Sequence, residues 1–303
     1  MYLKDLVDIQ MGQSPDSKFY NYDKIGLPFY QGKADFGRIN PTPKIWCSKS
    51  KKEAKPNDIL ISVRAPVGDL NINNEQSCIG RGLAAITCRP DVDMMYLYYY
   101  LKYLKPQLKH ISTGSTFESI NRTQLENLII NYKPYLEQIK ISNILQVVER
   151  QIEVKENLLR LYDLLVKSRF VEMFGDPNAS RTKYKLVPIH TVTDCMVPGR
   201  DKPKSFTGEI PWITINDLNI NGYTNKSKLG LGLTIDEVKE VNRKCVPQGS
   251  VLMSCVGNLG LCSIASVDVV INQQLHSYQC NEFINNLYLM YYLSFKNTYM
   301  NKI

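Results

Sequence analysis

Residues 136–174 contain neither glycine nor proline, although the whole chain has 17 glycines and 15 prolines. Apolar side chains recur through this segment in steps of three and four residues, which is the spacing of one face of a helix. Charged residues of both signs lie between them. Such a helix is roughly 55 Å long at 1.5 Å per residue, whereas an ordinary helix has about 11 or 12 residues. The segment therefore predicts a spacer or one strand of a coiled coil, and the alternative is a long surface helix packed on one domain.

The sequence also indicates where this helix ends and which face is apolar. Pro134 is suited to start it, and Gly175 and Pro177 are suited to stop it. The apolar face that we expect to bind a partner consists of Ile141, Ile144, Val148, Ile152, Leu159, Tyr162 and Leu165. The sequence contains no second run of this kind to cover it, and apolar areas of this size are rarely left in water. We therefore expect a second polypeptide to cover this face.

The sequences on either side of the helix resemble each other. Residues 58–101 align with residues 250–293 without a gap, at one constant offset of 192 positions. Twelve of the 44 paired positions are identical, and eleven of the twelve are apolar, glycine or tyrosine residues. Chance similarity is the alternative, but it would require an ungapped coincidence in matching order. The pattern favours two copies of one fold that share a core and differ on their surfaces.

These features predict an α+β fold in which two repeated mixed α/β domains are joined by one long coiled-coil-type helix. We expect the first domain at residues 1–133, the helix at 134–175, and the second domain at 176–303. Within the first copy, the sequence predicts a strand over 58–66 and a short helix over 94–111.

Charge and hydropathy restrict the cellular setting and the partner. The formal net charge is +8, of which residues 1–133 carry +5, residues 134–175 carry none and residues 176–303 carry +3. A basic excess on the two flanking segments fits a polyanion such as nucleic acid, although the signal is weak. The sequence has no apolar run long enough to cross a membrane and no signal peptide at its start. We therefore expect a cytoplasmic protein whose eight cysteines are reduced thiols.

No catalytic motif is recognisable in the sequence. It lacks the phosphate-binding GxxxxGK[ST] loop and the Asp/Asn-Pro-Pro-aromatic motif of amino-methyltransferases. No Cys-x-x-Cys occurs, and the three histidines do not have zinc-ligand spacing. We therefore predict no catalytic residues, no metal site and no cofactor.

Residues that can read bases occur in both copies, on or beside the expected loops. Arginine can pair with guanine, and asparagine or glutamine with adenine, each through two hydrogen bonds, whereas lysine, serine and threonine more often hold phosphates. The candidate DNA-binding residues are Gln31, Lys33, Arg38, Arg64, Arg81, Ser115, Thr116, Asn121 and Arg122 in the first copy, and Arg200, Lys202, Asn216, Asn219, Asn258, Gln273 and Gln274 in the second. Any one of them, taken alone, is more often an ordinary surface residue.

The chain resembles the DNA-specificity (S) subunit of type I restriction-modification systems. The resemblance rests on Leu27-Pro28-Phe29, on the strand at 58–63 with Gly68, and on TGSTFESINRTQLENLII at 113–130. YLEQIKI at 135–141 and SRFVEMFGDP at 168–177 complete it. It implies two target-recognition domains that each read half of a split site in double-stranded DNA, with helices between them as a spacer. It also implies docking of methyltransferase (M) subunits, which bring the S-adenosylmethionine chemistry, and of restriction (R) subunits, while the S subunit itself is not catalytic.

The resemblance leaves two alternatives open. At the 192-residue offset, Ile111 pairs with Ile303, so the second copy stops before a second TGSTF-like loop and a second long helix. We therefore also consider a truncated or decoy S subunit that binds its methyltransferase without forming an active complex, and self-association through the uncovered helix. An enzyme that combines recognition and catalysis in one chain is the alternative from another class.

Overall fold

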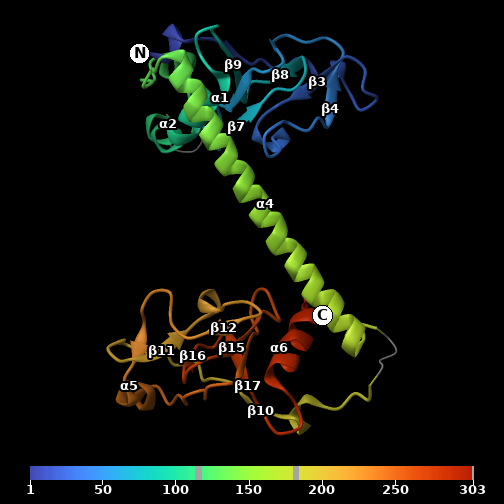
Figure 1. The fold of residues 1–303 in the computed structure, drawn as a ribbon, viewed down its shortest axis with the longest axis vertical. Coiled ribbons are helices and arrows are strands. Elements are labelled where there is room, and N and C mark those ends of the chain that lie inside the picture. Colours follow the sequence, from blue (N-terminus) through green and yellow to red (C-terminus); the bar gives the residue numbers. More distant parts are fainter. Residues whose placement is uncertain (113–117, 180–183, 302–303) are drawn as a thin grey trace. The chain divides into compact units, whose positions relative to one another are not determined.

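The computed structural model describes residues 1–112, 118–179 and 184–301. Its longest element is the uninterrupted helix α4 (Tyr135–Phe174), which confirms the helix predicted from the absence of glycine and proline (Figure 1). At its start, the carbonyl of Pro134 accepts hydrogen bonds from the N–H groups of Glu137 and Gln138. At its end, Gly175 adopts a φ of 86° and donates its N–H to the carbonyl of Val171. A left-handed residue at this position favours glycine because glycine has no Cβ.

The chain divides into two compact units, Met1–Glu156 (unit 1) and Asn157–Ile303 (unit 2), so that α4 contributes to both. Unit 1 has a four-stranded antiparallel sheet in the order β1-β9-β6-β7 and a mixed five-stranded sheet in the order β2-β4-β3-β8-β5. Its elements are β1 (Val7–Met11), β2 (Tyr20–Asn21), β3 (Leu27–Tyr30), β4 (Ile45–Cys47), β5 (Glu53–Ala54), β6 (Ile59–Ser62), β7 (Leu70–Ile72), β8 (Ser77–Ile79), β9 (Leu83–Cys88), α1 (Met94–Tyr103), α2 (Lys105–Ile111) and α3 (Arg122–Glu126). Its main core lies between the first sheet and the helices α1, α2 and α3.

Unit 2 repeats this architecture with a smaller second sheet. One sheet has the order β10-β17-β14-β15-β12 and the other the order β13-β11-β16. Its elements are β10 (Thr193–Met196), β11 (Ile210–Ile213), β12 (Tyr223–Thr224), β13 (Gly232–Leu233), α5 (Ile235–Glu240), β14 (Val251–Ser254), β15 (Cys262–Ala265), β16 (Val270–Ile271), β17 (Leu275–Cys280), α6 (Asn286–Phe295) and α7 (Asn297–Met300). The chain therefore has the predicted α+β fold, with two sheet-rich domains joined by a long helix.

Strand registers confirm the repeat residue by residue. In unit 1, Ile59 pairs with Ile72 and with Ile86, and in unit 2, Val251 pairs with Ile264 and with Tyr278, which is the same pattern 192 positions later. The helices α1 and α6 begin and end at the same offset.

The loop between the two hairpin strands also repeats. The hydroxyl group of Ser62 donates to the carbonyl of Pro66 at 2.7 Å, and that of Ser254 donates to the carbonyl of Asn258 at 2.6 Å. Gly68 and Gly260 close these loops with φ angles of 83° and 78°. Ser62/Ser254 and Gly68/Gly260 are among the twelve identical pairs. The repeat therefore preserves the shape of the hairpin loop as well as the core.

Two predicted elements differ in extent from those observed. The strand predicted over 58–66 is shorter, because β6 ends at Ser62 and the chain then turns. The helix predicted over 94–111 is two helices, α1 and α2, which meet at Leu104. Pro106 explains the break, because proline has no N–H group and its ring would clash with the carbonyl of Lys102 in a continuous helix.

Each unit packs a tyrosine-rich helix against its own part of α4. In unit 1, the Tyr99 hydroxyl of α1 donates to Glu149 at 2.7 Å, and Gln138 is fully buried against the start of α1. In unit 2, Phe170 stacks on Tyr288 of α6 with a ring-centroid distance of 5.5 Å and meets Phe295 edge-on at 5.0 Å.

Candidate nucleic-acid interface

Four of the predicted DNA-binding residues of unit 1 line one surface hollow. Gln31, Lys33, Arg64 and Arg81 surround a volume of about 550 Å³. They come from three separate segments, which follow β3, follow β6 and connect β8 to β9. All four side chains belong to exposed residues. In the described part of the chain, neither Arg64 nor Arg81 has an ion-pair partner, so both guanidinium groups are available to an acceptor.

The sheet brings these segments together because β3 and β8 run parallel, with Tyr30 opposite Ile79. The carboxyl ends of adjacent parallel strands lie at the same edge, so the residues that follow both strands become neighbours. Gly80 donates its N–H to the carbonyl of Tyr30 at 2.8 Å, and a Cβ atom on Gly82 would lie 2.4 Å from the carbonyl oxygen of Gln31. Glycine at position 82 therefore permits the close approach that sets Gln31 beside Arg81.

Lys33 and Arg38 are engaged by carboxylates in the structure. Lys33 lies 3.0 Å from Asp69, which also pairs with Lys105 at 2.5 Å. Burial raises the pKa of Asp69, but the hydrogen bonds from Lys105 and Lys33 outweigh it, so that this pKa is lower than usual. Arg38 pairs with Glu153 at 3.3 Å and with Glu156 at 3.7 Å, both on α4. Contact of either cation with DNA remains a prediction, and it would compete with these ion pairs.

The remaining candidates of unit 1 do not line this hollow. Asn121 caps α3, where its side-chain oxygen accepts from the N–H of Gln124 at 2.9 Å. Arg122 pairs with Glu126 one turn later at 2.7 Å. Ser115 and Thr116 lie outside the described residues. Asn121 therefore has a structural role as the N-cap of α3, which accounts for an asparagine at this position without DNA contact.

Several candidates of unit 2 gather in the equivalent place. Gln273 and Gln274 lie in the turn between β16 and β17, and the N–H of Cys255 donates to the carbonyl of Gln274 at 2.9 Å, which joins this turn to the hairpin loop of Asn258. The N–H of Asn272 donates to the carbonyl of Ile213 at 3.0 Å and so joins the turn to the segment that holds Asn216.

Not every amide side chain of unit 2 is available to a ligand. The Asn219 side chain donates to the carbonyl of Tyr223, that of Asn258 accepts from Asn297, and that of Gln274 accepts from Asn272. Asn216 and Gln273 are exposed. These two are therefore the amide candidates of unit 2 that are exposed and whose side chains form no hydrogen bond among the described residues.

Arg243 is a residue of this region that the sequence did not single out. It is buried, and the central carbon of its planar guanidinium group lies 5.2 Å from the centre of the Trp212 ring. It donates to the carbonyl of Ile271 at 2.9 Å and to the carbonyl of Asp201 at 2.7 Å. Burial lowers the pKa of Arg243, against the opposing effect of Asp201. Arg243 thereby ties the segment that carries the exposed residues Arg200 and Lys202 to the strand that precedes Gln273 and Gln274.

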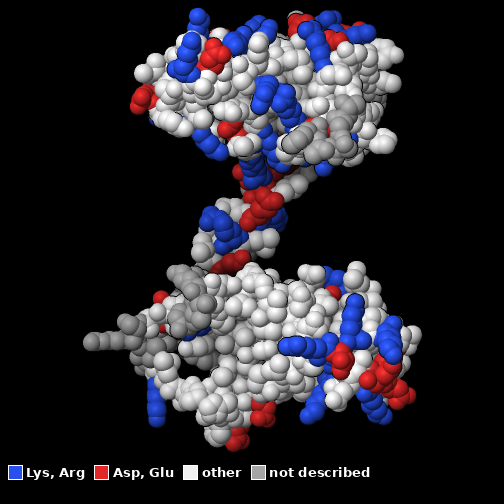
Figure 2. All heavy atoms as spheres, turned by 180° about the vertical axis from the view of Figure 1, so that it is seen from behind, with Lys and Arg blue, Asp and Glu red and all other residues white. Residues whose placement is uncertain are grey.

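Basic side chains do not form one continuous patch on the face shown in Figure 2. Lysines and arginines are spread over unit 1, whereas in unit 2 charges of both signs gather at the end that holds α5. There, Lys204 pairs with Glu240 and Lys239 with Asp236, each at 3.6 Å. The candidate interface is therefore defined by the loops at the sheet edges rather than by an extended basic surface.

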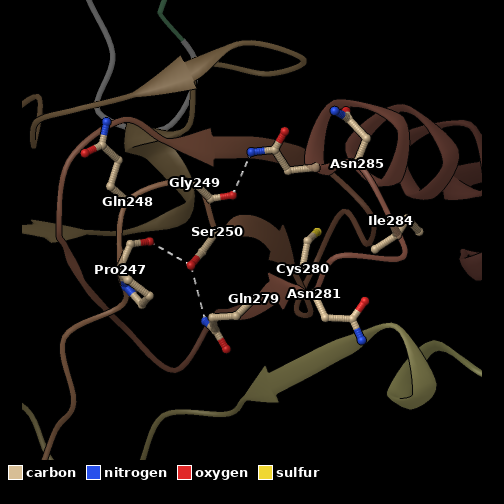
Figure 3. Close-up of a pocket in the computed structure, with 10 residues that line it drawn as sticks. Pro247, Gln248, Gly249, Ser250, Gln279, Cys280, Asn281, Ile284 and Asn285 are labelled. Carbon is tan, nitrogen blue, oxygen red and sulfur yellow. Dashed lines mark hydrogen bonds between the residues drawn. The ribbon is translucent and has the colours of Figure 1, made fainter.

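A second hollow in unit 2 has a different character. It has a volume of about 420 Å³ and is lined by amide and hydroxyl groups that largely bond to one another (Figure 3). The Ser250 hydroxyl donates to the carbonyl of Pro247 at 2.7 Å and accepts from Gln279 at 3.4 Å, and Asn286 donates to the carbonyl of Gly249 at 3.0 Å. None of the predicted DNA-binding residues lines it.

Two findings concern the whole described part of the chain, residues 1–112, 118–179 and 184–301. No group of three or more His, Cys, Asp or Glu residues there is arranged to hold a metal ion. None of the helices there is both long and apolar enough to pass through a bilayer.

A family model described as "Type I restriction modification DNA specificity domain" matches residues 1–160 and 192–303. A protein of Methanocaldococcus jannaschii described as a putative type I restriction enzyme MjaX specificity subunit is 45% identical over 148 residues, which cover 48% of this chain and 35% of that protein. The aligned part of the chain thus spans about a third of the length of this curated relative.

Two solved structures are also similar. A chain from a study of complex assembly and conformational transition of the type I R-M system is 44% identical, with a TM-score of 0.51, over 55% of this chain and 42% of that chain. The crystal structure of the S subunit of a type I restriction-modification system from M. genitalium matches 100% of this chain and 78% of that chain with a TM-score of 0.59. At 14% identity, this second likeness shows a shared fold alone.

Proposed function

We propose that this chain, which belongs to the type I restriction-modification DNA specificity family, is the subunit that reads the DNA sequence in such a complex. The observation that carries the proposal is the hollow of unit 1, where Gln31, Lys33, Arg64 and Arg81 converge from three segments. Arginine and glutamine are the side chains that pair with base edges through two hydrogen bonds, and lysine is suited to phosphate.

Each unit would read one half of a bipartite site in double-stranded DNA. The two units share strand registers, but they carry different residues at equivalent loop positions. Arg64 corresponds to Val256, Arg81 to Gln273 and Gly82 to Gln274 at the 192-residue offset. Two similar folds with different side chains at their sheet edges would recognise different base sequences, and α4 would set the spacing between them.

The exposed face of α4 supports the docking of other subunits. Of the seven residues predicted to form this face, the six beyond Ile141 are between 49% and 65% exposed: Ile144, Val148, Ile152, Leu159, Tyr162 and Leu165. Ile141 is half-buried. Exposed apolar surface of this extent is typical of interaction sites. Methyltransferase subunits, joined by restriction subunits, are the partners that we propose, with self-association as the alternative.

The chain would have no catalysis of its own, since methyl transfer and cleavage would be supplied by the partner chains. Incubation of the purified chain with DNA and labelled S-adenosylmethionine tests this point. We expect no transfer by the chain alone and transfer when the methyltransferase subunits are added. Methylation by the chain alone would refute the non-catalytic role.

The assignment of sequence reading is tested by exchange of residues 1–133 for the corresponding region of another specificity subunit. We expect the methylated sites, mapped by sequencing, to change in one half and to keep the other half. Co-purification with the methyltransferase subunits serves as the control that the exchanged protein still assembles. An unchanged set of sites in an assembled complex would overturn the proposal.

A further inference from the structure

The segment that follows the first strand is held differently in the two units. In unit 1, the N–H of Gly12 donates to the carbonyl of Leu83 at 2.9 Å, and the N–H of Gln13 donates to the carbonyl of Ile79 at 3.0 Å. Ile79 is the last residue of β8 and Leu83 is the first of β9, so both bonds reach the turn that carries Arg81. Two backbone donors thereby hold this segment against the candidate interface of unit 1.

Strand registers identify the equivalent segment of unit 2. In unit 1, Val7 of β1 pairs with Cys88 of β9, and in unit 2, Thr193 of β10 pairs with Cys280 of β17. Cys280 is the equivalent of Cys88 at the 192-residue offset, which makes Thr193 the equivalent of Val7. From 7 to 193 is a step of 186 positions, so residues 12–14 have their equivalents 186 positions later.

Pro198 takes the place of Gly12 in unit 2 and cannot form the same contact. Proline has no N–H group, so the first of the two bonds has no donor. A Cβ atom on Gly12 would lie 2.2 Å from the carbonyl oxygen of Gly80, so a residue with a side chain cannot approach the turn as closely. At Gly199, the equivalent of Gln13, a Cβ atom would meet nothing within 4 Å. Within the described residues, no backbone hydrogen bond joins this segment of unit 2 to the turn between β16 and β17.

Arg243, which follows α5, supplies the missing connection. Its guanidinium group donates to the carbonyl of Ile271 at 2.9 Å and to the carbonyl of Asp201 at 2.7 Å. Ile271 is the equivalent of Ile79, so the carbonyl that accepts from a backbone N–H in unit 1 accepts from a side chain in unit 2. Asp201 belongs to the segment that follows β10. One buried side chain thus makes the connection that two backbone N–H groups make in unit 1.

The guanidinium group of Arg243 is itself held in one place. Arg243 is 7% exposed and lies over the ring of Trp212, which is 4% exposed. Phe206, later in the same segment as Asp201, meets the Trp212 ring edge-on at 5.9 Å. Arginine presents its donors in a rigid planar fork, so two acceptors bound by one guanidinium group are held at a set separation. The position of Asp201 relative to Ile271 therefore depends on this side chain.

The neighbours of the two acceptors are the candidate reading residues of unit 2. Arg200 and Lys202 flank Asp201, and both are exposed. Neither has an ion-pair partner among the described residues. Gln273, two residues after Ile271, is also exposed. The contact of Arg243 with both carbonyls thus keeps two available cations near an available amide.

We propose that Arg243 is a positioning residue for base reading by unit 2, because its guanidinium group holds the segment of Arg200 and Lys202 beside the turn of Gln273. Arg243 is buried and does not itself touch DNA. The two units position their reading side chains by different means, unit 1 through its backbone and unit 2 through this side chain. The proposal rests on the proposed function, since it assigns Arg200, Lys202 and Gln273 to the half-site that unit 2 reads.

The test measures the binding of the complex with its methyltransferase subunits to the specific site and to variants of each base pair. Exchange of residues 1–133 identifies the half read by unit 1, and the other half belongs to unit 2. Arg243→Met should lower the preference at one or more base pairs of the unit 2 half by about fivefold or more, and leave the other half unchanged. Lys244→Met removes the same charge at the next, exposed residue and should leave every preference unchanged. If Arg243→Met does not assemble, Arg243→Lys takes its place with the same expectation, since its ammonium group has no planar fork.

A double-mutant cycle separates positioning from a purely structural role. Arg200→Gln with Lys202→Gln should weaken specific binding by about fivefold or more in the unaltered complex, but by less than about twofold when Arg243 is already replaced. A residue that only stabilises the fold would change the active fraction and leave the effect of Arg200→Gln with Lys202→Gln the same in both backgrounds.

The outcomes also distinguish this proposal from the proposed function. Equal losses in both backgrounds, no loss from Arg200→Gln with Lys202→Gln, or unchanged base preferences in the Arg243 variant would each overturn the positioning role. An unaltered complex without any base preference in the unit 2 half would instead refute the reading function on which the proposal rests.

Discussion

The hydroxyl group of Tyr99 donates a 2.7 Å hydrogen bond to Glu149, and Lys102 pairs with the other oxygen of the same carboxylate at 2.9 Å. Tyr99 and Lys102 lie one turn apart on α1, while Glu149 lies on α4. One carboxylate thus links the first domain to the long helix through two donors. Because Glu149 retains 25% of its side-chain exposure, this contact is weaker than a fully buried one.

Tyr99→Phe removes one of these donors without changing the ring. We expect the free energy of unfolding of unit 1 to fall by about 1–2 kcal/mol, since the lost bond is to a charged group that is partly exposed. The two tryptophans, Trp46 and Trp212, lie one in each unit, so Trp46 fluorescence in a Trp212→Phe background reports on unit 1. Tyr103→Phe, at a side chain that is 77% exposed, is the matched control. Equal losses in both variants would contradict a specific role for the Tyr99 hydroxyl.

The same carboxylate should make the stability of unit 1 depend on pH. Burial raises the pKa of Glu149, but the hydrogen bonds from Lys102 and Tyr99 outweigh it and hold this pKa below its usual value of 4.5. A lowered pKa in the folded state contributes stability above pH 4.5 that is lost as the pH falls through the folded-state pKa. Glu149→Gln lacks this contribution at every pH. Urea unfolding between about pH 6 and pH 3 should therefore show the two proteins converging in acid, and a constant difference would disprove the linkage.

Arg243 should matter more to unit 2 than any exposed cation. Arg243→Met removes the donors to the carbonyls of Ile271 and Asp201 and leaves both acceptors without these partners. We expect a loss of about 2–4 kcal/mol in the free energy of unfolding of unit 2. Trp212 fluorescence in a Trp46→Phe background measures it, since the Trp212 ring lies against Arg243. Lys239→Met, at an exposed surface pair, should cost little, and a similar loss there would argue against the anchoring role.

Much of this fold could be predicted from local sequence pattern. The absence of glycine and proline over 136–174 predicts α4, because the other residue types in that segment tolerate a helix and its ends carry stop signals. The ungapped 192-residue offset predicts the shared strand registers, since any inserted residue would move side chains to the opposite face of a strand. Pro106 could also have been used to predict the break between α1 and α2 at Leu104.

The partners of individual side chains could not be predicted in this way. Arg38 carries the same signal as Arg64 in the sequence, yet it pairs with Glu153 on α4. That contact joins positions more than a hundred residues apart, and no periodicity encodes it. Arg243 was missed because it belongs to no repeated motif and lies outside the 44 aligned positions. Convergence of Gln31, Arg64 and Arg81 likewise depends on the parallel pairing of β3 with β8, which only the structure provides.

Gly82 should be required for the shape of the unit 1 hollow. A Cβ atom at this position would lie 2.4 Å from the carbonyl oxygen of Gln31, so that Gly82→Ala must displace one of the two segments. We expect a loss of about 1–3 kcal/mol in the stability of unit 1, as for other overpacked sites, together with weaker specific DNA binding. Gly32→Ala is the matched control for stability, because a Cβ atom there meets nothing within 4 Å. DNA binding by Gly82→Ala at the level of the unaltered protein would contradict this reading.

Arg64 provides the most direct test of base reading, because it is exposed, lines the hollow and has no ion-pair partner among the described residues. In the assembled complex, Arg64→Gln should weaken binding to the specific site by about 1–3 kcal/mol and relax the preference at one base pair. Lys140→Gln changes the charge equally at an exposed position of α4 and is the matched control. Binding measured on the specific site and on variants of each base pair separates the two roles of a cation. A loss confined to one base position indicates base reading, whereas a uniform loss with a lower salt dependence indicates a phosphate contact and would overturn the assignment of Arg64 as a reading residue.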